Sequence, residues 1–342
     1  MEKIMKAWIG LMVGFLTIWQ AVSAQELHFS QYFNAPMLVN PANTGFQPDA
    51  DYRVGVNYRN QWASVMSNPY KTFSAWGDVQ LFSQVLEAGW VGLGGMLLRD
   101  QAGTGSLTST KAYGSIAYHQ VLGYNSLISL GFNIGMVEKR IDFTKLTFDN
   151  QWNGQFFDNV NIPSNEPFTR DKVSYFDLQA GVNYAVFPTD DIYLNAGISV
   201  MHINQPKESF FGNDGLGARL PMRYNLFVNS TIKLNDRWIV NPNLYYSQMT
   251  GVSEWVGGLN ANYNLSGDGS SQLIGGLYYR SQDAFIPMVG YQWNDFKLIV
   301  NYDVTVSSLS KYNAARGAYE LSLTKVGIFD PSRPVKCPAV KF

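Results

Sequence analysis

Apolar and polar residues alternate along most of the chain. From 52 to 59, from 128 to 136 and from 176 to 184, every second residue is apolar, and the residues between are polar or glycine. Side chains of a β-strand point alternately to its two faces, so a period of two predicts strands. The pattern predicts about fourteen strands and no long helix after residue 24. The predicted strands occupy 52–59, 71–81, 90–99, 106–119, 128–136, 176–184, 191–201, 221–233, 238–248, 254–264, 272–280, 283–293, 297–305 and 317–325.

A soluble β-sandwich also alternates, but two features of the strands favour a membrane barrel. The predicted strands have about 9 to 13 residues, longer than the strands of most soluble sheets and close to the length that crosses a bilayer at a tilt. Aromatic residues such as Trp90 and Trp238 stand near strand ends. Outer-membrane barrels carry aromatic girdles at these positions.

The lengths of the connections alternate as well. Connections after even-numbered strands are short, whereas those after odd-numbered strands include long ones at about 140–173, 202–219 and 306–316. Short periplasmic turns and long extracellular loops are typical of outer-membrane barrels, and a sandwich has no reason to keep this parity. The sequence therefore predicts an all-β fold, a transmembrane outer-membrane β-barrel of about 14 antiparallel strands over residues 52–325.

The first 24 residues have the layout of a secretory signal peptide. Lys3 and Lys6 precede an apolar run from 7 to 19, and Val22-Ser23-Ala24 is a small-residue cleavage pattern. An uncleaved membrane anchor is the alternative, but the apolar run is shorter than the about 20 residues that span a bilayer. We therefore predict that residues 1–24 are removed and that the protein is exported to the outer membrane.

Residues 25–51 precede the first predicted strand and are too apolar for a free tail. They include Phe29, Tyr32, Phe33 and Phe46 and carry little charge. We expect this segment to pack inside the barrel or under its periplasmic mouth. The alternative is that the segment contains one further strand.

Composition narrows the classes of function. The chain has 25 basic and 26 acidic residues, for a formal net charge of -1. A nucleic-acid-binding protein needs an excess of Lys and Arg for phosphate contacts, so no nucleic-acid partner is expected. The single cysteine, Cys337, excludes an intrachain disulfide framework and a Cys-rich zinc site.

If the apolar face of the barrel meets lipid, the polar face lines the lumen. The charged residues predicted on that face are Arg53, Arg59, Asp78, Lys111, Asp177, Arg223, Glu254, Arg280, Lys297, Asp303 and Glu320. Their signs nearly balance, whereas a charge-selective porin needs an excess of one sign at its constriction. Balance favours ion pairs across a filled or plugged lumen. The alternative is a wide pore in which these residues are solvated.

No catalytic residue, cofactor or metal site is expected, and we predict that the protein is not an enzyme. The histidines at 28, 119 and 202 are scattered and form no metal-binding motif. Ser115 and His119 lie on one face of a predicted strand, but four residues of strand separate them by about 13 Å. That distance is too long for a nucleophile and its base.

Two regions are candidates for contacts with partners. Aromatic residues gather in the long outer loops, at Phe148, Trp152, Phe156, Phe157, Phe210 and Phe211. Exposed apolar patches mark interaction sites, although these loops are alternatively a lid that folds inward. Strand parity places the tail, residues 326–342, in the periplasm. Its candidate contacts are Cys337, Pro338 and Phe342.

Several motifs along the chain are shared with a known protein family. The N-terminal signature is Phe-Ser-Gln-Tyr-Phe-Asn at 29–34 and Asn-Pro-Ala-Asn-Thr-Gly at 40–45. Further matches are Tyr-Arg-Asn-Gln-Trp at 58–62, His-Ile-Asn-Gln-Pro at 202–206, Leu-Pro-Met-Arg-Tyr at 220–224, Gly-Leu-Tyr-Tyr-Arg at 276–280 and the closing Cys337-Pro338. In these motifs the chain resembles the PorP/SprF family, and the resemblance covers essentially the whole mature chain. One departure is Gly317-Ala318-Tyr319-Glu320, where the family often has Gly-Ser-His-Glu.

The resemblance implies an outer-membrane barrel of the type IX secretion and gliding system of Bacteroidota. It implies a non-catalytic role in exporting and anchoring a large secreted surface protein, an adhesin, through its C-terminal sorting domain. Some members of the family are instead core components that contact the periplasmic ring subunits and a peptidoglycan-associated lipoprotein. The expected partners are therefore one of these sets, together with outer-membrane lipid. A passive outer-membrane channel is the remaining alternative.

Overall fold

The computed structural model describes residues 29–47, 50–123, 125–166, 169–211, 219–329, 340 and 342. The predicted signal peptide and the candidate contacts Cys337 and Pro338 lie outside the described residues.

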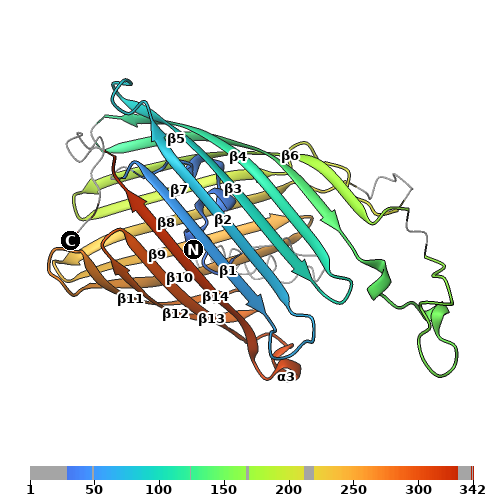
Figure 1. The fold of residues 1–342 in the computed structure, drawn as a ribbon. Helices are drawn as coiled ribbons and strands as arrows, with labels where there is room; N and C mark the ends of the chain where they lie inside the picture. The colour runs from blue at the N-terminus through green and yellow to red at the C-terminus, as the bar shows by residue number, and fades with distance from the viewer. Residues whose placement is uncertain are drawn as a thin grey trace, which may run out of the picture.

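Fourteen antiparallel strands form a closed barrel in which β1 pairs with both β2 and β14 (Figure 1). The strands are β1 (Tyr52–Gln61), β2 (Tyr70–Leu81), β3 (Gly89–Ala102), β4 (Leu107–Leu122), β5 (Ser126–Arg140), β6 (Lys172–Thr189), β7 (Ile192–Met201), β8 (Arg223–Asn235), β9 (Trp238–Met249), β10 (Val252–Asn264), β11 (Ser271–Arg280), β12 (Ala284–Trp293), β13 (Phe296–Thr305) and β14 (Arg316–Gly327). The predicted all-β barrel of 14 strands is confirmed. Within the described ranges, no helix has the length and apolarity needed to span a membrane.

Strands β3 to β6 are longer than predicted, at 14, 16, 15 and 18 residues. The charged run after Val137 breaks the alternation, which made it a loop in the sequence-based prediction. In the structure Lys139 pairs with Val173, and Arg140 pairs with Lys172 across β5 and β6. Salt bridges from Lys172 to Glu138 and from Arg140 to Asp171 flank this extension. The extension carries the loop between β5 and β6 well beyond the barrel (Figure 1).

Burial follows the alternation, with apolar side chains outside and polar side chains inside. On β5, Leu130, Phe132 and Ile134 are 48%, 51% and 60% exposed, whereas Ser129 and Asn133 are 1% exposed. A soluble protein buries its apolar face, so this inverted pattern identifies the outer surface as the lipid-facing one. Trp90 is an exception to the predicted girdle. It points inward, is 1% exposed and donates from Nε1 to the carbonyl of Gly45 at 2.9 Å.

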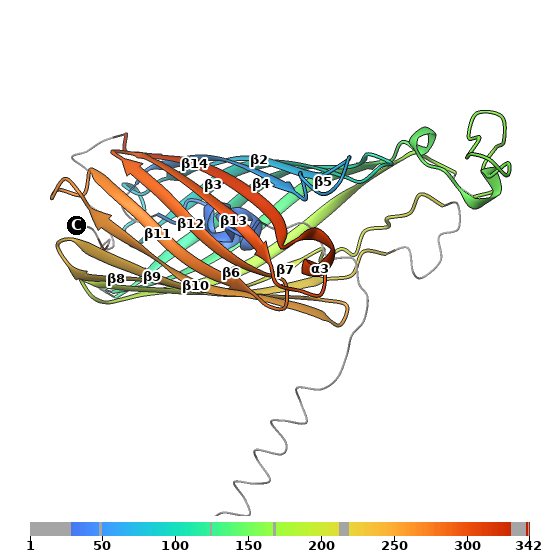
Figure 2. The same ribbon diagram turned by 90° about the horizontal axis from the view of Figure 1, so that it is seen from below.

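The two ends of the barrel differ as the parity of the connections predicts. The short connections after even-numbered strands lie at one end, which we call the turn end. The long connections 141–171, 202–222 and 306–315 lie at the other, the loop end, together with helix α3 (Ser310–Asn313; Figure 2). In outer-membrane barrels the turn end faces the periplasm and the loop end faces outward.

Residues 29–47 lie inside the barrel, and we call them the plug (Figure 2). The plug forms three short helical turns, η1 (Tyr32–Asn34), α2 (Pro36–Val39) and η2 (Pro41–Asn43). Pro36 and Pro41 begin two of these turns, where a missing N–H costs no hydrogen bond. Most plug residues are buried against the polar inner wall of the barrel.

Candidate functional site in the barrel lumen

The plug approaches the wall most closely at three glycines. A Cβ atom on Gly92 would lie 1.9 Å from the carbonyl oxygen of Thr44, and one on Gly181 would lie 1.9 Å from Oδ1 of Asn40. A Cβ atom on Gly131 would lie 2.3 Å from the plug backbone at residue 41. Glycine inside a strand commonly marks such a close backbone approach. These positions therefore fit the wall to the plug.

Asn40 joins the plug to two strands through its side chain. It is fully buried, and Nδ2 donates to the carbonyls of Val182 on β6 at 3.0 Å and Ile198 on β7 at 3.2 Å. Its Oδ1 accepts from the backbone N–H of Ala42 at 2.8 Å, which caps the η2 turn. One asparagine thus shapes the plug and fixes it to the wall.

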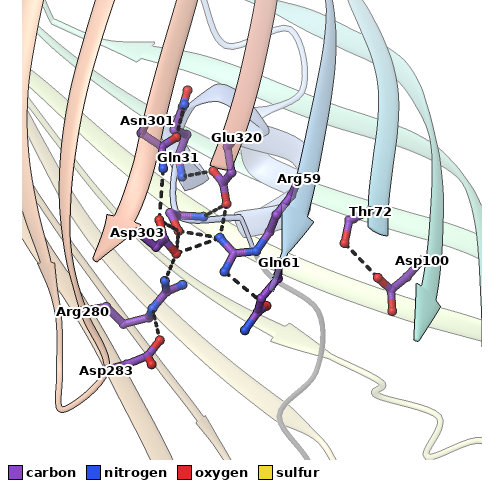
Figure 3. Close-up of polar contacts among 11 residues, drawn as sticks. Gln31, Arg59, Gln61, Thr72, Asp100, Arg280, Asp283, Asn301, Asp303 and Glu320 are labelled. Carbon is purple, nitrogen blue, oxygen red and sulfur yellow. Dashed lines mark hydrogen bonds and ion pairs between the residues drawn. The ribbon is translucent and has the colours of Figure 1, made fainter. Parts of the chain in front are cut away.

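The central feature of the lumen is a group of four charged side chains, Arg59, Arg280, Asp303 and Glu320, which we call the ionic cluster (Figure 3). Arg59 Nη1 donates to Asp303 Oδ2 at 3.0 Å and also bonds Glu320 Oε1. Arg280 bonds Asp303 through Nη2 and forms a salt bridge to Asp283 at 2.8 Å. All four cluster members are at most 5% exposed. The two positive and two negative charges compensate one another out of contact with bulk water.

The ionic cluster also holds the beginning of the plug. The backbone N–H groups of Ser30 and Gln31 donate to the two carboxylate oxygens of Glu320, at 2.7 and 3.0 Å. The Ser30 hydroxyl lies 2.9 and 2.8 Å from the oxygens of Asp303. The Gln31 side chain donates to Asn301 (Figure 3). The carboxylates therefore serve as acceptors for the plug backbone as well as partners for arginine.

A second ion pair holds the plug nearer the turn end. Arg53 bonds Asp78 through two nitrogens, one of them at 2.9 Å. The backbone N–H of Gly45 donates to Asp78 at 2.7 Å, and Arg53 Nη2 donates to the carbonyl of Asn43 at 2.8 Å. The plug is thus bound to charged wall residues at both of its ends.

The structure places the other predicted lumen charges on inward-facing positions too. Asp177 accepts from the Tyr113 hydroxyl at 2.6 Å and lies 2.8 Å from His202 Nδ1. Arg223 Nε donates to Ser247 at 2.7 Å. The remaining predicted lumen charges are Lys111, which is buried, and Glu254 and Lys297, which are half-buried.

Ser115 and His119 both contact the plug, at Thr44. The Ser115 hydroxyl bonds the Thr44 hydroxyl, and His119 Nε2 lies 2.8 Å from the Thr44 carbonyl oxygen. The other ring nitrogen of His119 lies 2.7 Å from the hydroxyl of Ser129, directly across the strand pair. Because a carbonyl oxygen only accepts, Nε2 carries the proton and Nδ1 accepts from Ser129. Sequence spacing alone could not identify this cross-strand partner.

The plug side chains Ser30, Gln31 and Asn40 were not among the predicted site residues. The signal was present in the chain, because they lie in the two N-terminal motifs at 29–34 and 40–45. Within the described ranges, no group of three or more His, Cys, Asp or Glu side chains is placed to hold a metal ion.

A cavity of about 450 Å³ lies between the plug and the turn end. It is lined by polar side chains of β9 to β14, by Phe33 of the plug and by Trp76 of β2. Phe342 also lines it and lies over Gly269 of the β10–β11 turn. At the rim, hydrogen bonds from Ser266 and then Ser270 lower the pKa of Asp268 to about 2.

The predicted loop residues lie at the loop end with different exposures. Trp152, Phe156 and Phe157 are 50%, 56% and 45% exposed on the projecting loop, and the rings of Trp152 and Phe157 pack edge to face. Phe148 is half-buried and Phe211 is exposed. Phe210 is also half-buried, since it packs on an inner apolar cluster near Phe143. In the described part of the loop, the exposed aromatic residues Trp152, Phe156 and Phe157 do not fold inward as a lid.

A closed barrel with a lipid-facing apolar exterior and a polar lumen filled by its own N-terminal segment is an outer-membrane β-barrel protein. Solved barrels resemble it in fold at low sequence identity. A deltaS2 mutant of the TodX monoaromatic hydrocarbon channel has a TM-score of 0.54 and 11% identity, over 87% of this chain and 94% of that one. The CymD monoaromatic hydrocarbon channel has a TM-score of 0.50 and 10% identity, over 90% and 95%. A Pseudomonas aeruginosa FadL homologue has a TM-score of 0.50 and 10% identity, over 84% and 92%.

The amino-acid sequence identifies the protein family to which the chain belongs. The family of type IX secretion system membrane proteins PorP/SprF matches residues 21–324, and the chain belongs to this family. No curated protein matches the chain. The solved barrels, at 10–11% identity, share the fold alone.

Proposed function

We propose that this protein is a non-catalytic barrel of the type IX secretion system that helps export a large secreted surface protein and anchor it through its C-terminal domain. Family membership supports the secretion system, and the barrel fold supports the outer membrane. The observation that carries the proposal is the filled lumen. A barrel whose interior is occupied by its own chain is suited to binding partners at its ends.

The attachment of the plug to the barrel wall favours a partner-binding role over a role as an open channel. It is held by Glu320 and Asp303 at its start and by Asp78 near its end. A hydrogen bond from the plug to a charged wall side chain contributes about 1.5–3 kcal/mol, and several such bonds hold the plug at its two ends. Spontaneous release of the plug is therefore strongly opposed.

The projecting loop is the proposed contact for the secreted protein. Trp152, Phe156 and Phe157 present a group of exposed aromatic side chains there, and aromatic residues are favoured at the centres of interfaces. At the turn end, Phe342 marks the proposed periplasmic contact, together with Cys337 and Pro338, which lie outside the described residues.

The alternative role is a core component that links the outer membrane to the periplasmic ring and a peptidoglycan-associated lipoprotein. Gentle detergent extraction, affinity capture of this chain and mass spectrometry of the captured proteins separate the two roles. Capture of a large secreted protein with a C-terminal sorting domain supports the proposal. Capture of ring subunits and a lipoprotein without such a protein supports the core role instead.

A matched pair of variants tests the loop. Replacing both Trp152 and Phe156 with alanine should reduce capture of the secreted protein at least about tenfold, because interface anchors of this type contribute 2 kcal/mol or more. Tyr312→Ala is the control, since Tyr312 is an aromatic residue at the same end and is 85% exposed. Equal capture by both variants would remove the loop from the proposed interface.

A passive channel is the second candidate, because the similar solved barrels include hydrocarbon channels. Single-channel recording in planar bilayers tests it directly. A steady, large conductance of the unmodified protein would contradict the filled lumen and favour the channel.

A further inference from the structure

The cavity at the turn end has a lysine with no counterion. Lys297 is a half-buried residue of β13 that lines the cavity, and it forms no ion pair within the described residues. Its direct cross-strand neighbours are Gln292 on β12 and Thr324 on β14, which are both neutral. The other cation of the wall, Arg53, is already paired with Asp78. An ammonium group removed from bulk water without a partner is unfavourable, so this position is suited to receive an anion.

A row of hydrogen-bonding side chains runs across the strands at the level of Lys297. Directly opposed pairs that line the cavity join Gln272 to Gln292, Gln292 to Lys297, and Lys297 to Thr324. Neighbouring strands are about 4.8 Å apart, so the row from β11 to β14 extends over about 14 Å. Its amides carry both donors and acceptors. This combination matches the alternating N–H and C=O groups of a peptide backbone.

The volume and the lining of the cavity narrow the class of ligand further. About 450 Å³ lies within the range of pockets that hold small ligands. Phe33, Trp76 and Ile239 supply apolar surface for one hydrophobic side chain. Asp268 and Asp295 also line the cavity, at the turns, and repel a ligand with several negative charges. These features favour one carboxylate, a short backbone and an apolar side chain.

We infer that this cavity binds the carboxylate end of a short apolar peptide segment, with Lys297 as the carboxylate partner and the amide row as the backbone partner. The site opens at the turn end, away from the loop that is proposed to contact the secreted protein. The inference stands on the cavity alone and does not depend on the identity of the captured partner.

Calorimetric titration of the full-length protein in detergent micelles tests the site. The probe is acetyl-Ala-Ala-Phe with a free carboxylate, and its C-terminal amide is the matched comparison. We expect the carboxylate peptide to bind at least about tenfold more tightly, because a charge-assisted hydrogen bond contributes about 1.5–3 kcal/mol. N-acetylmuramic acid, an acidic sugar, should bind more weakly than the peptide.

Variants separate the charge of Lys297 from its structural role. Lys297→Gln should lower affinity for the carboxylate peptide about tenfold and leave affinity for the amide unchanged. Lys297→Arg should retain most of the binding. Lys325→Gln is the control, because Lys325 lies on the outward face of β14 beside Thr324, over the ring of Phe296.

Three results would overturn the inference: equal binding of the two peptides, no binding of either peptide, or undiminished carboxylate binding by Lys297→Gln. Tighter binding of the acidic sugar than of the peptide would overturn the peptide assignment. These outcomes are distinct from failure of the proposed function, which is measured by capture of partners.

Discussion

The ionic cluster and the cavity wall face the same lumen but compensate their charges differently. In the cluster, Arg59 and Arg280 are matched by Asp303 and Glu320, and all four are almost fully buried. Along the cavity, the direct cross-strand neighbours of Lys297 are neutral, and Lys297 has no counterion in the described part of the chain. A polar lumen therefore has two uses. Saturated charges hold the plug in place, and an unsaturated one is free to bind a ligand.

The largest loss of stability is expected when the cluster loses a carboxylate. Asp303→Asn leaves Arg59 and Arg280 with one carboxylate of the original pair, so the free energy of unfolding should fall by about 3–5 kcal/mol. Urea unfolding in lipid vesicles, followed by tryptophan fluorescence, measures this change. Asp190→Asn, in the exposed β6–β7 turn, is the control and should have no effect. A loss under about 1 kcal/mol would mean that the cluster behaves like a solvated surface pair.

A smaller loss of stability is expected when a substitution displaces the plug without changing any charge. A Cβ atom on Gly92 meets the backbone of Thr44 at 1.9 Å, so Gly92→Ala must shift the plug. We expect a loss of about 1–3 kcal/mol, typical of overpacking, and a rise in single-channel conductance. Gly275→Ala is the matched control, because a Cβ atom there meets nothing within 4 Å. Unchanged conductance in both variants would show that the plug does not limit passage.

An exposed ion pair outside the lumen should contribute little to the free energy of unfolding. Arg140 and Asp171 lie 3.6 Å apart, and their side chains are 68% and 59% exposed. Arg140→Gln should lower the free energy of unfolding by less than about 1 kcal/mol. The difference should shrink further in high salt, which screens exposed charges. A salt-independent loss of several kcal/mol would remove the contrast between buried and exposed pairs.

The smallest effect on stability is expected at the cavity. Lys297→Gln removes a charge that has no counterion, so unfolding free energy should change by no more than about 0.5 kcal/mol. The same urea experiment measures it beside Asp303→Asn. A large loss would show that Lys297 is part of a structural network. A negligible loss, combined with weaker peptide binding, would separate the ligand site from the structural cluster.

Much of the fold follows from local sequence pattern. Each of the fourteen predicted segments overlaps one observed strand, because alternation reflects which face of a strand meets lipid. The ends of β5 and β6 were the main error, since the charged residues Lys139, Arg140 and Lys172 interrupt the apolar pattern while the strands continue. The position of Trp90 near a strand end predicts a girdle residue. In the structure its side chain instead points inward and donates to the carbonyl of Gly45.

The candidate site was only partly accessible from the sequence. Alternation gives the inward face of each strand, and thus the set of charged residues that lines the lumen. It does not give the partners of each charge. Ser129, for example, is ten residues from His119 along the chain, yet the register of β4 and β5 places the two side chains opposite each other.

The barrel, the alternation of short and long connections and the polar character of the lumen follow from the sequence alone, because the sequence pattern repeats from strand to strand. Which charges meet depends on the closed barrel. Arg59 is 244 residues from Asp303 and 261 from Glu320, and they meet because β14 closes the barrel against β1. The same closure encloses the plug and leaves Lys297 beside neutral neighbours. Pairing of this kind depends on strand register and on what fills the lumen, and neither is encoded in any short stretch of chain.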